Sequence, residues 1–124
     1  MSTIKTETLS TPSNATVPVD TVVNGTAKAW VNFDGTGTVA ILRAFNVSSI
    51  TDNGTGNYTV NFTNAMPDVY YSTFVGASTI GSNTSIDTWS NGYLFTTTSV
   101  QIELENSSSS AIDRSHVSVA IFSN

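Results

Sequence analysis

The chain has 124 residues, which is enough for one domain with a single hydrophobic core. Only 10% of the residues are charged and the formal net charge is −5. This balance excludes nucleic-acid binding, because phosphate contacts need clustered Lys and Arg side chains. The sequence has no cysteine, so disulfides, thiolate nucleophiles and Cys-ligated zinc are excluded as well. The four basic residues are Lys5, Lys28, Arg43 and Arg114.

The N-terminal stretch lacks the apolar run of a secretory signal, and no segment approaches the ~20 apolar residues of a membrane-spanning helix. We therefore expect a protein that is made in a cytoplasm, is not exported and is not inserted into a membrane.

Residues 1–26 form a distinct opening segment, rich in Thr and Ser, that contains Pro12 and Pro18. Proline at these positions is incompatible with a helix interior, and the apolar residues are too sparse to form a core. We predict an extended N-terminal arm, followed by a head domain over residues 27–124. Two alternatives stay open for the arm: a frayed tail, or a segment that pairs with another subunit or a larger particle. Its apolar anchors are Ile4, Leu9, Val17, Val19, Val22 and Val23, and the first four are the predicted attachment residues.

From Ala27 onward, apolar residues recur at every second position, which is typical of half-buried strands. Two strands flank the sequence DGTG at residues 34–37, and two more flank DNGTG at residues 52–56. Glycine-rich turns of this kind predict two hairpins. A proline turn at residues 64–68 then precedes the remaining strands. These are expected at residues 69–77, 93–97, 100–104 and 117–122.

The chain thus contains about eight short strands, and no window has helical periodicity. This pattern predicts an all-β fold, a small antiparallel β-sandwich or barrel-like domain that follows the extended arm.

Residues suited to catalysis or metal binding are few. His116 is the only histidine and is expected to face away from the apolar side of its strand, and no Gly-x-Ser-x-Gly elbow is present. Glu103 and Glu105 share one face of a strand, as on the solvent side of an edge strand. Residues 52–57 lack the alternating acidic ligands and closing glutamate of a calcium loop. We therefore expect no catalytic residue, no metal and no cofactor.

Aromatic side chains are the remaining candidates for recognition. Several fall out of phase with the inward faces of their strands, and exposed rings next to Asn and Ser are suited to stacking on sugars. Burial against a neighbouring subunit is the stronger alternative, because monomers seldom leave large apolar patches in water. The candidate residues are Trp30, Tyr70, Phe74, Trp89 and Tyr93.

The segment from Ala27 to Tyr71 carries a particular series of motifs: AKAWVNF, GTGTVAI, NVSSITDNGTG, YTVNFT and AMP. It resembles a tail-fibre or virion structural module of tailed bacteriophages, of the type found in phages of marine bacteria. The resemblance covers about a third of the chain. One departure is Leu42, which stands where the arginine of the module is expected to follow Ile41 directly. The interaction partner of Arg43 is therefore left open, whereas the expected fold is unaffected.

The resemblance implies a noncatalytic part of a virus particle, made in the cytoplasm of the bacterial host. Such domains are commonly β-rich homotrimers, so it implies a homotrimer that is attached to other virion proteins by residues 1–26. A short tail-fibre or fibre-tip subunit that contacts the host surface, including a host-surface glycan, is the expected role. The alternative is a decoration protein on the capsid, because both roles need an attachment arm and an exposed β head.

Overall fold

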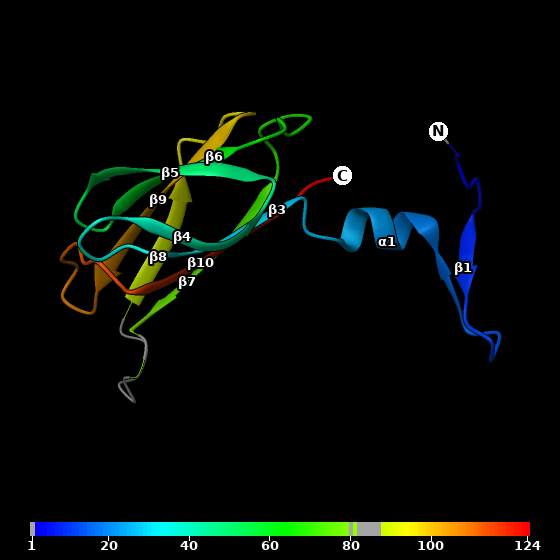
Figure 1. Ribbon diagram of the computed structural model, residues 1–124, viewed down its shortest axis with the longest axis horizontal. Coiled ribbons are helices and arrows are strands. Elements are labelled where there is room, and N and C mark those ends of the chain that lie inside the picture. Colours follow the sequence, from blue (N-terminus) through cyan, green and yellow to red (C-terminus); the bar gives the residue numbers. More distant parts are fainter. Residues whose placement is uncertain (1, 80, 82–87) are drawn as a thin grey trace.

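The computed structural model describes residues 2–79, 81 and 88–124, and the side chains of residues 88–90 are outside this description. Two four-stranded antiparallel sheets pack face to face as a sandwich, which confirms the predicted all-β class (Figure 1). The first sheet has the strand order β4-β3-β10-β7, and the second has the order β5-β6-β9-β8. The strands of the sandwich are β3 (Ala29–Asp34), β4 (Ala40–Phe45), β5 (Val47–Gly54), β6 (Asn57–Phe62), β7 (Ser72–Ser78), β8 (Thr88–Tyr93), β9 (Ser99–Asn106) and β10 (His116–Phe122).

Both predicted hairpins are present. The DGTG turn joins β3 to β4, and the Asp34 carboxylate organises it by accepting hydrogen bonds from the Thr36 hydroxyl at 2.6 Å and the Thr36 amide at 2.8 Å. Both hydrogen bonds lower the pKa of Asp34, and the bond from the hydroxyl has the larger effect. The DNGTG turn joins β5 to β6, and there Asp52 accepts a hydrogen bond from the Gly54 amide at 2.9 Å. Asx turns of this kind explain why both turns place Asp ahead of Gly.

The chain passes from the first sheet to the second at Asn46, between β4 and β5. Asn46 has a φ of 53°, a left-handed conformation that Asn tolerates better than most residues. Its Nδ2 donates to the Lys28 carbonyl at 3.0 Å, and its Oδ1 accepts from the Asn64 amide at 2.8 Å. The side chain therefore fixes the corner by joining the start of β3 to the loop after β6.

The core lies between the sheets and follows the two-residue period of the sequence. Each inner strand contributes alternate residues, which are buried almost completely. Phe33 and Tyr58 meet edge to face across the sandwich, with ring centroids 5.1 Å apart. The fully buried side chains are Phe33, Tyr58, Val31, Val60, Val100, Ile102, Leu104, Val117 and Ile121.

The arm is not extended throughout. It contains a short hairpin of β1 (Thr8–Ser10) and β2 (Thr16–Pro18), followed by a seven-residue helix, α1 (Val19–Gly25). Pro18 precedes this helix instead of interrupting it, so the helix is free of the steric clash that proline causes in an interior. In Figure 1 the arm projects away from the sandwich.

Two further expectations were wrong. Residues 93–97 do not form the predicted strand, because the observed strand β8 ends at Tyr93. Leu94 then has a φ of 48°, and the Thr96 hydroxyl accepts a hydrogen bond from the Ser99 amide at 2.9 Å, so this Thr-rich stretch forms a turn. The second error concerns Glu103 and Glu105, because their strand, β9, is not at an edge but lies between β6 and β8.

Candidate functional site

The outer face of the first sheet carries an aromatic row, to which β4, β3 and β7 each contribute an aromatic residue and β10 contributes an alanine. Phe45 on β4 lies opposite Trp30 on β3, Trp30 lies opposite Ala120 on β10, and Ala120 lies opposite Phe74 on β7. The exposed fractions are 55% for Phe45, 41% for Trp30 and 62% for Phe74. Phe122, also on β10, contacts Phe74 edge to face with ring centroids 5.7 Å apart. The row is therefore an exposed aromatic surface on a rigid sheet.

A polar row follows one pleat further along the same face. Asn32, Ser118 and Gly76 lie opposite one another on β3, β10 and β7. The Nδ2 atom of Asn32 donates to the Ser118 hydroxyl at 2.9 Å and lies 2.9 Å from Nε2 of His116. The histidine is thus a hydrogen-bonded residue of this face, beside the polar row. Its position on the side of β10 opposite Val117 is the one predicted.

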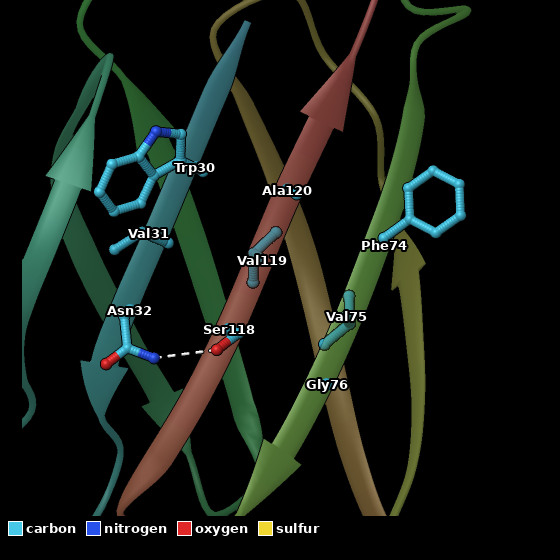
Figure 2. A pocket seen from close by; sticks show the side chains of 9 residues that line it. All are labelled: Trp30, Val31, Asn32, Phe74, Val75, Gly76, Ser118, Val119 and Ala120. Carbon is cyan, nitrogen blue, oxygen red and sulfur yellow. Dashed lines mark hydrogen bonds between the residues drawn. The ribbon is translucent and has the colours of Figure 1, made fainter. Parts of the chain in front are cut away.

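A shallow groove of about 390 Å³ extends over parts of the aromatic and polar rows. Figure 2 shows the β10 backbone between Trp30 and Phe74, whose rings both point away from β10, and the hydrogen bond from Asn32 to Ser118 on the floor. None of the described residues that line it is charged. They are Trp30, Val31, Asn32, Phe74, Val75, Gly76, Ser118, Val119 and Ala120.

Alternation along each strand explains why these side chains meet on one face. Val117, Val119 and Ile121 of β10 point into the core, so Ser118 and Ala120 must point outward. The period was visible in the sequence, and it also identifies Phe122 as outward. Phe45 and Phe122 were nevertheless missed as recognition candidates, because each follows an apolar run that looked like core.

The other predicted recognition residues do not join this surface. Tyr70 is 89% exposed and lies in the loop between β6 and β7. Tyr93 lies on the second sheet, opposite Gln101, where its hydroxyl accepts a hydrogen bond from Asn57 at 2.7 Å. Trp89 of β8 lies opposite Glu105 of β9, and the side chain of Trp89 is outside the described part of the structure.

On the described part of the second sheet's outer face, polar side chains of β5, β6 and β9 bond one another. Asn57 accepts hydrogen bonds from Gln101 at 2.6 Å and from Asn53 at 3.2 Å. Asn61 donates to the hydroxyls of Ser49 and Thr51 at 3.1 and 3.0 Å. These mutual hydrogen bonds already use much of the bonding capacity of the face.

The predicted attachment residues lie on the arm with different exposures. Ile4 is 90% exposed and Leu9 is also exposed, whereas Val17 and Val19 are partly covered. The helix exposes the two other apolar anchors, Val22 and Val23.

Within residues 2–79, 81 and 88–124, no three His, Asp or Glu side chains are placed to hold a metal ion together. The same part of the chain has no helix of the length and apolarity needed to span a membrane. Comparisons with protein-family models, with curated proteins and with solved structures found no match to this chain.

Proposed function

We propose that this protein is a noncatalytic structural subunit of a bacteriophage virion, most consistent with a short tail fibre or fibre tip. In this role the arm attaches the subunit to other virion proteins, and the sandwich contacts the host surface. The proposal is motivated by the motifs of residues 27–71 and by the separation of the molecule into these two parts (Figure 1).

The observation that carries the proposal is the apolar surface of the arm. The arm exposes Ile4 ahead of its hairpin, Leu9 on the hairpin, and Val22 and Val23 on its seven-residue helix. It has too few residues to bury them in a core of its own. Apolar side chains that are exposed to solvent on a projecting segment are characteristic of a surface that contacts another protein. Attachment of the arm to a partner in the particle accounts for them.

A homotrimer is part of the proposal, and β4 is the contact that supports it. All six residues of this edge strand are exposed, and they include Ile41, Leu42 and Phe45. An exposed apolar edge strand has unpaired backbone groups as well as apolar side chains, and both favour association with another chain.

The location on the particle is tested by binding a labelled antibody against this chain to intact virions and imaging them by electron microscopy. Label at the tail supports the fibre role. Label distributed over the capsid shell, with none at the tail, shows that the protein is a decoration protein instead. Absence of the chain from purified particles contradicts the whole proposal.

The role of the arm is tested by removing residues 1–26. The truncated protein should fold as a sandwich, because the core residues begin at Ala29, but it should no longer join the particle. A matched control replaces Thr3, Thr6 and Ser13, three exposed polar residues of the arm, with alanine. Normal incorporation of the truncated chain contradicts attachment through the arm.

A further inference from the structure

We propose that the groove between Trp30 and Phe74 is a binding site for a neutral saccharide. The inference rests on the proposed function for the source of that ligand, a glycan of the host surface. The binding itself depends only on the groove and is measurable without a virus particle.

The dimensions of the groove suit a sugar ring. Trp30 on β3 and Phe74 on β7 are separated by one strand, β10, so their backbones are roughly 10 Å apart at the usual strand spacing. Ala120 lies between them in the same row and has only a methyl group, which keeps the floor low. At ~30 Å³ for each water molecule, the volume of about 390 Å³ accommodates a monosaccharide with its hydroxyl groups.

The rings of Trp30 and Phe74 match the apolar side of a sugar. The face of an aromatic ring carries partial negative charge, and the C–H groups of a pyranose carry partial positive charge. Both rings are held on strands, so little conformational freedom is lost when a ligand packs against them. In Figure 2 the two rings lie at the outer edges of the floor, and each points away from β10.

The polar row matches the hydroxyl side of a sugar. Among the described residues, Asn32 uses its Nδ2 atom for its hydrogen bonds, which leaves its carbonyl oxygen as an acceptor. Ser118 accepts from Asn32, which leaves its own proton to be donated. One acceptor beside one donor is the pattern that a sugar hydroxyl satisfies. Since the described lining residues carry no charge, the groove favours a neutral saccharide over an acidic one.

The size of the surface argues against a second copy of the chain as the occupant. Trp30, Phe45 and Phe74 are 41%, 55% and 62% exposed, so the three rings of the aromatic row offer roughly 300 Å² if each covers 150–250 Å² when buried. A stable protein interface needs about 800 Å² on each side. The polar face of the second sheet is a weaker candidate, because Asn57, Asn61 and Gln101 already bond their neighbours.

The test is an NMR titration of the isotope-labelled full chain with the methyl glycosides of glucose, galactose, mannose and N-acetylglucosamine. Concentrations up to about 100 mM occupy most of a site whose Kd is about 10 mM. At least one glycoside should shift the amide signals of Trp30, Ser118 and Ala120. Trp30→Ala and Phe74→Ala should each weaken binding about tenfold or more.

Tyr70→Ala is the matched control, because Tyr70 is a more exposed aromatic residue outside the groove. It should leave binding unchanged. The inference is overturned if no glycoside shifts the groove signals, or if Tyr70→Ala weakens binding as much as the groove variants do. Dissociation of an oligomer by Trp30→Ala, seen by sedimentation, also overturns it, since the face is then a subunit contact.

Failure of this inference is distinct from failure of the proposed function. A chain that is found at the phage tail but binds no glycoside in the groove keeps its structural role and loses the saccharide site. A chain that binds a glycoside in the groove but is absent from virions has the site and lacks the proposed role.

Discussion

The hydroxyl of Tyr58 on β6 donates a hydrogen bond of 2.5 Å to Oδ1 of Asp113, which lies 55 residues further along the chain. The same hydroxyl is 2.9 Å from the Gly35 carbonyl, and Asp113 also accepts from the Gly56 amide at 2.8 Å. The pair therefore joins both predicted turns to the segment before β10. Burial, followed by the hydrogen bond and charge of Asp113, raises the pKa of Tyr58.

Replacing Tyr58 by phenylalanine should destabilise the sandwich by about 1–3 kcal/mol, the usual cost of leaving a buried acceptor without its donor. The ring itself is retained, so its packing against Phe33 is preserved. Urea unfolding followed by circular dichroism measures the change. Tyr70→Phe removes an exposed hydroxyl as a control, and equal unfolding midpoints for both variants would show that the buried pair contributes nothing.

Two glycines with similar backbone conformations should respond differently to alanine. Gly37 has a φ of +60° with no atom within 4 Å of an added Cβ, so Gly37→Ala should cost about 1–2 kcal/mol from backbone strain. Gly56 has a φ of +68°, and a Cβ there lies 2.5 Å from the Leu104 carbonyl oxygen. Steric overlap adds to the strain, for a total of about 2–5 kcal/mol. Thermal unfolding compares the two, and an equal loss of stability contradicts the close approach of Gly56 to β9.

Stability should fall at alkaline pH because of Tyr71. Burial raises the pKa of this tyrosine to about 12, although a backbone hydrogen bond with Thr96 partly offsets the shift. Because the pKa of Tyr71 is higher in the folded state, the group contributes its full stabilisation at pH values below its unfolded pKa of about 10. That contribution is lost as the pH rises from about 10 to about 12. Urea unfolding across this range should show a shallower decline for Tyr71→Phe than for the natural sequence, and parallel declines would exclude the mechanism.

Sedimentation of the purified chain should give about three times the 13.1 kDa mass of one subunit. Leu42→Glu places a charge on the exposed edge strand β4 and should shift the equilibrium toward monomer without unfolding the sandwich. Ser107→Glu adds the same charge in an exposed loop and should leave the trimer intact. A natural chain that stays monomeric at micromolar concentration contradicts the trimer.

The sequence by itself determined the two hairpins and the strands of the sandwich other than β8. A period of two residues assigns alternate side chains to opposite faces, and Gly in DGTG and DNGTG permits the positive φ that tight turns need. It also placed His116 opposite Val117, since neighbours on a strand always face opposite sides. These features depend on contacts within a few residues, so they can be predicted from the sequence without a structure.

Only the tertiary structure decided which strands are neighbours and which surfaces remain exposed. β9 pairs with both β6 and β8, so Glu103 is on an inner strand, although its local pattern is the same as that of an edge strand. Phe45, Trp30 and Phe74 come from three strands, and only the antiparallel register with β10 and β3 places them in one row. Strand order and register depend on contacts between distant parts of the chain, and a local alternation is compatible with many such pairings.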